Sequence, residues 1–120
     1  MKWNAALVLS YGKPVPGREA KAMEVFADGL TMFGKLAADE KCAEPEVFNH
    51  LVTGGMFIIK TESMEAIHHI LEMDEIRRML DVAMFTVEDF DVEMFVTGEH
   101  LMEAMSLYTA IGTELGYISA

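Results

Sequence analysis

Residues 54–79 have the sequence GGMFIIKTESMEAIHHILEMDEIRRM, which contains the change from strand to helix that decides the fold. The run Met56–Thr61 is short and largely apolar, as expected of a buried β-strand. From Ser63 onward the apolar residues recur at three- and four-residue steps, so a helix is predicted with Ser63 as its N-cap. The phase of this pattern is lost near Met73, and Asp74 is expected to cap a second helix. The stretch therefore predicts one strand followed by two short helices.

The inward face of each short helix follows from the same spacing. In the first helix the predicted buried stripe is Met64, Ile67, His68 and Leu71. In the second helix it is Ile76, Met79, Leu80, Ala83 and Met84. A single continuous stripe would turn charged residues of the segment 74–78 toward the core, so the interruption has a structural explanation.

The rest of the chain supplies three more strands and two more helices. Strands are predicted at Trp3–Tyr11, Glu46–Val52 and Val87–Val96, and helices at Gly17–Asp39 and Glu99–Leu115. The order β-α-β-β-α-β with an added C-terminal helix predicts an α+β, ferredoxin-like fold with a four-stranded antiparallel sheet. The first and third strands are apolar on both faces, so they are expected in the middle of the sheet with the more polar strands at its edges.

The helix at Gly17–Asp39 has two apolar lines. The stronger line is Met23, Phe26, Ala27, Leu30, Phe33, Gly34 and Ala37, and the thinner one is Val25, Met32 and Leu36. A helix with two such lines is expected to contact its own sheet along one of them and a second surface along the other.

The chain is expected to form one ferredoxin-like domain, residues 1–97, followed by a helical segment, residues 98–120. Two helices cover only one face of the predicted sheet, and the other face also carries apolar residues. Either the sheet of a second subunit or the C-terminal helix must cover it, so that helix packs on its own domain or on a dimer partner. The hydrophobic fraction of 52% is slightly above the average of soluble proteins, which favours a homodimer through the open sheet face.

Charge and composition exclude several classes of partner and site. The net charge of −11 repels nucleic acid and anionic membrane surfaces, and no apolar run approaches the roughly 18 residues of a membrane span. Cys42 is the only cysteine, so a disulfide framework or thiolate metal cluster is not expected. Asp89, Asp91 and Glu93 alternate along one strand and form a line, not a cage for a cation. We therefore expect a cytoplasmic protein without metal or cofactor.

The second half of the predicted fold resembles a known family. GGMFIIKTESMEAIHHI followed by TVEDFDVEMF is similar to YCII-like and DGPF-type domains of the dimeric α/β-barrel superfamily. The residues that carry the resemblance are Gly54–Gly55, Phe57, Ile59, Ser63, Glu65, Ala66 and Val92–Phe95. The resemblance implies two ferredoxin-like subunits packed sheet to sheet, with a pocket between sheet and helices. The YCII pattern also pairs a first-helix histidine with an aspartate before a proline. Here Asp74 is near that position, but Glu75 replaces the proline and residues 17–39 contain no histidine.

Five residues are candidates for binding a ligand, and four for acid–base chemistry. The ligand-binding candidates are His68, His50, Phe48, Met64 and Tyr11, and the catalytic candidates are His68, His50, Asp74 and Tyr11. A core histidine with one hydrogen bond is the simpler interpretation of His68, and a pocket histidine is the alternative. Eleven methionines favour core filling or an adaptable apolar pocket for a small apolar or aromatic ligand.

Two functions remain open from the sequence. The first is a homodimeric small-molecule-binding module with a methionine-rich pocket. The second is a cofactor-independent small-molecule enzyme, of the YCII-like acid–base, isomerase or monooxygenase type. An imidazole and a carboxylate that converge in one cavity would favour the enzyme.

Overall fold

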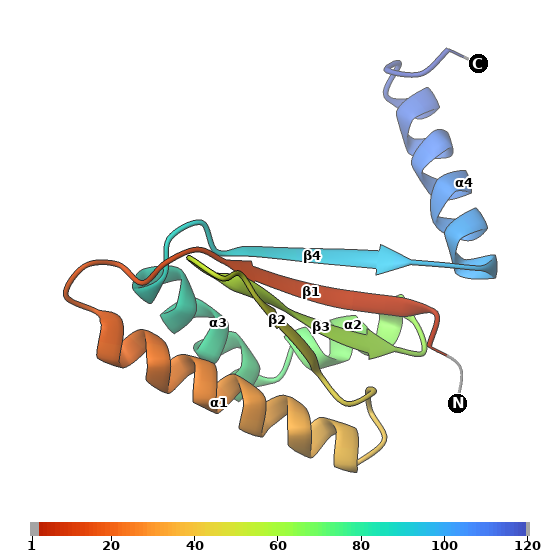
Figure 1. The fold of residues 1–120 in the computed structure, drawn as a ribbon. Helices are drawn as coiled ribbons and strands as arrows, with labels where there is room; N and C mark the ends of the chain where they lie inside the picture. The colour runs from red at the N-terminus through yellow and green to blue at the C-terminus, as the bar shows by residue number, and fades with distance from the viewer. Residues whose placement is uncertain (1–2, 120) are drawn as a thin grey trace.

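The computed structural model describes residues 3–119, and of residues 99 and 100 only the backbone. Its elements are β1 (Ala5–Tyr11), α1 (Glu19–Ala38), β2 (Glu46–Asn49), β3 (Gly55–Thr61), α2 (Met64–Leu71), α3 (Asp74–Thr86), β4 (Asp91–Val96) and α4 (Glu99–Glu114). The predicted order of strands and helices is confirmed (Figure 1). Ala120, the last residue of the predicted C-terminal segment, lies outside the described residues.

The four strands form one antiparallel sheet in the order β2-β3-β1-β4. The two largely apolar strands, β1 and β3, are central, and the more polar β2 and β4 are the edges, as predicted. In the register of the sheet, Leu7 lies opposite Ile59 on one side and opposite Met94 on the other. This is the predicted ferredoxin-like α+β arrangement.

The edge strands are shorter than predicted. β2 ends at Asn49 because His50 Nδ1 accepts hydrogen bonds from the backbone N–H groups of Val52 (3.0 Å) and Thr53 (3.3 Å), which turns the chain early. β4 begins at Asp91, after Asp89 adopts a left-handed backbone conformation with φ of 54°. Val87 forms only an isolated bridge, with Pro14.

Helices α1, α2 and α3 cover one face of the sheet (Figure 1). The core between them and the sheet is made of Ala5, Leu7, Leu9, Val25, Phe33, Leu36, Cys42, Phe57, Ile59, Ile67, Ile70, Ile76, Met79 and Ala83. Leu7, Phe33, Ile59 and Ile67 are fully buried. Odd-numbered residues of β1 and β3 therefore face this layer, and even-numbered ones face the opposite side.

The buried face of α1 takes residues from both predicted apolar lines. The buried residues are Ala22, Val25, Gly29, Phe33 and Leu36, whereas Met23 and Leu30 are exposed. The cause is Gly29: a Cβ atom built there would lie 3.2 Å from Phe57 Cε2, so the helix packs closely on Phe57 through a position without a side chain. The face against the sheet thus combines Phe33 of the stronger line with Val25 and Leu36 of the thinner one.

The two short helices α2 and α3 are jointed as predicted, but their details differ. Ser63 caps α2, with its Oγ accepting from the Ala66 N–H at 3.2 Å. Asp74 is not a cap, because it is the first residue of α3 and the capping position is Met73. His68 is exposed, and Ile67 and Ile70 form the buried stripe instead. Burying an isoleucine side chain costs less free energy than burying an imidazole, because a buried imidazole needs a hydrogen-bond partner.

The other side of the sheet has no cover among the described residues, and we call it the open face. Its apolar residues are Ala6, Val8, Phe48, Met56, Ile58 and Phe95, and its polar ones are Ser10, Glu46, Lys60, Asp91 and Glu93. Phe48 and Phe95 are 57% and 50% exposed. Lys60 Nζ lies 3.2 Å from Glu46 Oε2, so these two residues form an ion pair at the β2 edge of the sheet. At the other edge Asp91 raises the pKa of Glu93 by a hydrogen bond and by charge repulsion.

Candidate functional site

A cavity of about 370 Å³ lies between α1, α3 and the end of the sheet at which β1 finishes. Its volume falls within the usual range of small-molecule sites. Its walls come from β1, α1, β3 and α3, and its mouth is formed by the loop at residues 49–54. The cavity therefore sits where a rigid core meets a loop.

The inner wall is aromatic. The ring of Phe57 lies 5.2 Å from that of Phe26, 6.1 Å from Tyr11 and 6.3 Å from Phe33, all in edge-to-face geometry. Such arrangements place the positive edge of one ring against the negative face of another. Of the ten methionines among the described residues, Met23 and Met79 line the cavity, so its wall is aromatic more than methionine-rich. The wall offers flat, rigid surfaces suited to an aromatic ligand.

One side of the cavity is closed by two loops that bond to each other. The Gly12 N–H donates to the Glu88 carbonyl at 2.7 Å, and the Val15 N–H donates to Thr86 at 2.9 Å. Gly12 is required here because a Cβ atom would come within 2.9 Å of the Glu88 oxygen. Arg18 Nη1 donates to the Phe85 carbonyl at 2.6 Å and joins the start of α1 to the end of α3. These bonds hold the wall in place before any ligand arrives.

The Tyr11 hydroxyl is positioned by the register of the sheet. Tyr11, Gly55 and Asn49 lie in one row across β1, β3 and β2. The Tyr11 hydroxyl donates to Asn49 Oδ1 at 2.9 Å, and a Cβ atom at Gly55 would come within 2.9 Å of that same oxygen. Gly54 has a φ of 69°, and a Cβ atom there would overlap the Tyr11 carbonyl oxygen. The glycine pair thus builds both the turn and the polar edge of the cavity.

We predict that Tyr11 ionises at unusually high pH. Burial raises the pKa of its phenol, so the folded state favours the neutral form. The stabilisation that this provides is present below the ordinary value of about 10 and is lost as the pH rises through the higher folded value. A difference titration of phenolate absorbance, wild type minus Tyr11→Phe, checks this. A component that titrates at or below the ordinary value would contradict the burial of the phenol.

His50 is held at the mouth by its own loop. Backbone N–H groups of Val52 and Thr53 donate to Nδ1, so the neutral ring carries its proton on Nε2. The His50 N–H donates to the Gly54 carbonyl at 2.9 Å, which closes the loop. The side chain is exposed and lines the cavity. Nε2 is therefore a donor that a ligand can reach.

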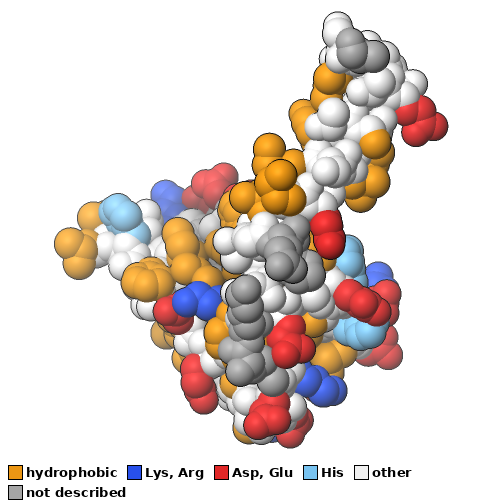
Figure 2. Space-filling view, turned by 90° about the vertical axis from the view of Figure 1, so that its right-hand side faces the viewer, with side chains coloured by type: hydrophobic (Ala, Val, Ile, Leu, Met, Phe, Trp, Pro, Cys, Tyr) orange, Lys and Arg blue, Asp and Glu red, His pale blue; other side chains and the backbone are white. Residues whose placement is uncertain are grey.

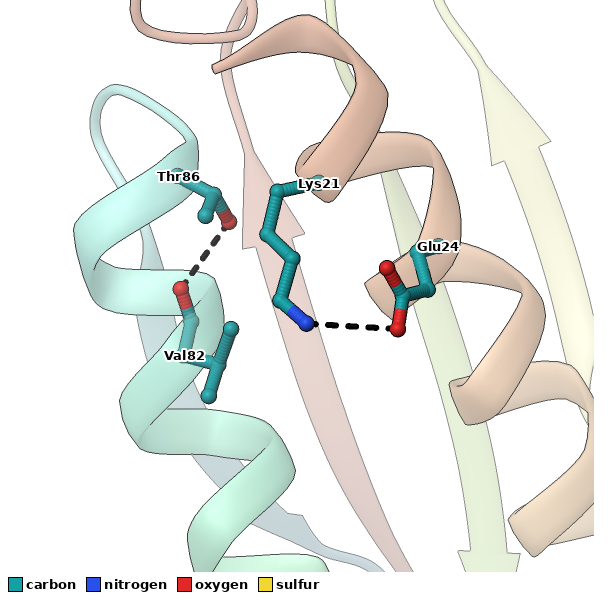
Figure 3. A network of polar contacts seen from close by, with 4 residues as sticks. All are labelled: Lys21, Glu24, Val82 and Thr86. Atoms are coloured by element: carbon teal, nitrogen blue, oxygen red, sulfur yellow. Dashed lines mark hydrogen bonds and ion pairs between the residues drawn. The ribbon is translucent and has the colours of Figure 1, made fainter.

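No charged side chain is among the described residues that line the cavity. At the nearby seam of α1 and α3, Lys21 Nζ lies 3.2 Å from Glu24 Oε1, on the helix surface (Figure 3). Thr86 lines the cavity, but its hydroxyl donates to the Val82 carbonyl at 2.9 Å (Figure 3). The polar groups that remain are the Tyr11 hydroxyl, the Asn49 amide, the His50 ring and the Thr53 hydroxyl. This environment suits an uncharged molecule.

The structure brings only two of the predicted site residues together. Tyr11 and His50 line the cavity. Phe48 lies on the open face, and Met64 packs against the core. His68 and Asp74 are exposed on α2 and α3, outside the cavity. Of the four candidates for acid–base chemistry, Tyr11 and His50 therefore share the cavity, and His68 and Asp74 do not.

Several residues that line the cavity were not predicted as site residues from the sequence: Asn49, Phe26, Phe57, Gly29 and Thr53. Asn49 could have been found, because a turn at the glycine pair sets it opposite Gly55 and hence in the row of Tyr11. The spacing of residues along the sequence does not indicate that a cavity would form.

Among the described side chains, those of residues 3–98 and 101–119, no three of His, Cys, Asp or Glu form a group that could hold a metal ion. None of the described helices is both long and apolar enough to cross a bilayer. Cys42 is buried, and burial together with Glu44 raises the pKa of its thiol, which disfavours a reactive thiolate.

Known structures share this architecture at low sequence identity. A dimeric protein of unknown function and ferredoxin-like fold from Bacteroides fragilis matches with a TM-score of 0.58 at 9% identity, over 78% of this chain and 95% of that one. SnoaB, a cofactor-independent oxygenase from Streptomyces nogalater, matches with a TM-score of 0.60 at 11% identity, over 82% and 97%. A protein from Deinococcus radiodurans proposed to be an antibiotic biosynthesis monooxygenase matches with 0.58 at 15%, over 78% and 93%.

The chain has a ferredoxin-like α+β fold. At these identities the similarity concerns the fold alone. No protein-family model and no curated protein sequence matches the chain. The resemblance to YCII-like domains is thus not confirmed, whereas the similar structures include a dimeric protein of ferredoxin-like fold, a cofactor-independent oxygenase and a protein proposed to be a monooxygenase.

Proposed function

We propose that this protein is a homodimeric binding module that holds a small, uncharged, apolar or aromatic molecule in the cavity beneath Tyr11. The observation that carries this proposal is a cavity of about 370 Å³ with an aromatic wall, polar groups only near its mouth and no charged lining residue. An apolar pocket with a few fixed polar groups is the usual form of a small-molecule site.

The polar groups define what the ligand presents. The Tyr11 hydroxyl, whose pKa is raised by burial, stays protonated at neutral pH and already bonds Asn49. His50 Nε2 offers a second donor at the mouth. A ligand with one hydroxyl or carbonyl group at the end of a flat ring system matches this pattern. A carboxylate would lose its hydration without gaining a cation.

Three probes with the same ring test the proposal: 2-naphthol, naphthalene and 2-naphthoate. We expect 2-naphthol to bind most tightly. We expect 2-naphthoate to bind at least about tenfold more weakly, because its charge would be buried without a partner. Isothermal titration calorimetry measures all three affinities.

Blocking the cavity supplies the matched control. Ala22 and Ala27 both lie on α1, but Ala22 is 7% exposed and lines the cavity, whereas Ala27 is exposed and does not. Ala22→Leu is expected to weaken 2-naphthol binding at least about tenfold by filling the space, and Ala27→Leu to leave it unchanged. Equal binding by both variants and the wild type would place the probe elsewhere and refute the proposal.

The dimer is proposed through the open face. Val8, Met56, Ile58 and Phe95 form an apolar patch on a sheet that no described element covers. Large exposed apolar patches of this kind mark interaction surfaces. The similar protein from Bacteroides fragilis is described as dimeric, which is consistent with this proposal.

A cofactor-independent enzyme acting on an aromatic substrate is the second candidate. The placement of Tyr11 and His50 at one cavity favours it, and the fold similarity to SnoaB is compatible with it. The absence of a carboxylate among the lining residues counts against acid–base chemistry. Oxygen uptake with 2-naphthol that disappears in Tyr11→Phe and His50→Gln, while binding persists, would establish the enzyme over the binding module.

A further inference from the structure

Helix α4 stands apart from the rest of the molecule. It leaves the end of β4 and points away from α1, α2 and α3, on the side of the sheet that those helices do not cover (Figure 1). Among the described elements, its contacts are few and are mainly with β4. Its large apolar side chains are exposed, including Met105 (55%) and Tyr108 (73%). A single helix of this length is only marginally stable in water without tertiary packing.

Seven apolar positions of α4 share one face, whereas the exposed Met102 and Leu107 lie elsewhere on the helix. Leu101, Ala104, Met105, Tyr108, Ile111, Gly112 and Leu115 fall within about a third of the helix circumference, by the rotation of 100° per residue. The polar residues Ser106, Thr113 and Glu114 lie on the other side. Figure 2 shows hydrophobic side chains along this projecting arm. We call the seven apolar positions the α4 stripe.

Backbone hydrogen bonds define both ends of α4. At its start the Thr97 N–H donates to the Asn4 carbonyl at 2.8 Å, which ties the beginning of the arm to β1. At its end Gly116 has a φ of 79°, and the Tyr117 and Gly116 N–H groups donate to the carbonyls of Gly112 (2.9 Å) and Thr113 (3.1 Å). This is a Schellman motif, in which Ile118 packs on Gly112. The arm is therefore a helix with a defined C-terminal end, and it presents an apolar face to solvent.

We infer that α4 is a clasp whose apolar stripe packs against the flank of a second copy of this chain. The inference rests on the proposed dimer through the open face. Two sheets packed face to face are about 10 Å apart, and a helix of 16 residues is about 24 Å long. An arm on the open side thus extends past the partner's sheet and reaches the layer beyond it. By two-fold symmetry each copy would hold the other.

Charge substitutions on the two sides of α4 test the clasp. Met105→Glu/Tyr108→Glu places two carboxylates in the stripe, and Ser106→Glu/Thr113→Glu places two on the polar side as the matched control. The first pair is expected to raise the dimer dissociation constant at least about tenfold, and the control less than about twofold. Sedimentation velocity over a concentration series measures both. Equal dissociation constants in all three proteins would overturn the clasp.

Hydrogen exchange distinguishes the clasp from its alternatives. The amides of α4 should be protected in the wild-type dimer and exchange rapidly in a monomer made by a substitution on the open face, such as Ile58→Lys. Protection that persists in that monomer would mean that α4 folds onto its own chain. Rapid exchange within an intact dimer would mean that the stripe awaits a different protein. Either result overturns the clasp while leaving the open-face dimer standing, and a wild type that is monomeric throughout overturns both.

Discussion

Replacing Phe57 with alanine is expected to lower the free energy of unfolding by about 3–5 kcal/mol, a large share of the roughly 5–15 kcal/mol of a typical domain. Phe57 is 5% exposed, and its ring contacts those of Tyr11, Phe26 and Phe33. Truncation removes the buried ring and leaves a hole that the central strand β3 cannot close. The melting temperature should fall by roughly 10–20 °C.

Thermal and urea unfolding at one fixed protein concentration measure this loss, because a dimer's apparent stability depends on concentration. The control is Phe85→Ala, at a side chain that is 70% exposed on α3, which should cost less than about 1 kcal/mol. Since the hole adjoins the cavity, added 2-naphthol is expected to restore part of the lost stability. A loss below about 1 kcal/mol at Phe57 would contradict the packed aromatic wall.

The topology of the sheet could be predicted because its signals are local. The run Met56–Thr61 has apolar side chains at both even and odd positions, which only a central strand can bury. Glycine and proline clusters mark the turns, and Ser63 marks the start of α2. Each of these depends on a few neighbouring residues, so none requires knowledge of distant contacts.

The phase of the helices depends on tertiary contacts and was partly wrong. The face of α1 that packs on the sheet takes residues from both apolar lines, and it is centred on Gly29, which lies close to Phe57. The same holds for α2, where Ile70 occupies the position against the sheet that spacing alone assigned to His68. Contacts between residues far apart in the chain therefore determine which face of each helix is buried.

The candidate site contains residues that could be predicted from the sequence and residues that could not. Tyr11 and His50 were among the candidates predicted from the sequence, and both line the cavity. Their partners could not be chosen without the register, which sets Asn49 in the row of Tyr11. Whether these residues bind a ligand stays a prediction.

Replacing Ile58 with lysine is expected to convert the dimer into a monomer. Ile58 lies on the open face between Val8 of β1 and Glu46 of β2, and Glu93 lies beyond Val8 in the same row. In the monomer the new ammonium group points into water between two carboxylates, so folding should be little affected. In a face-to-face dimer the same charge would be buried in an apolar interface, once from each copy.

We expect the dissociation constant to rise at least about 100-fold, which corresponds to about 2.8 kcal/mol. Light scattering after size exclusion should give twice the chain mass of 13.4 kDa for the wild type and the single mass for Ile58→Lys. Met84→Lys, at a side chain 62% exposed on α3, is the matched control and should remain dimeric. Because circular dichroism separates unfolding from dissociation, a folded Ile58→Lys protein that remains dimeric at micromolar concentration would place the interface elsewhere. The apolar residues of the open face would then need a different cover, and α4 would be the remaining element long enough to provide it.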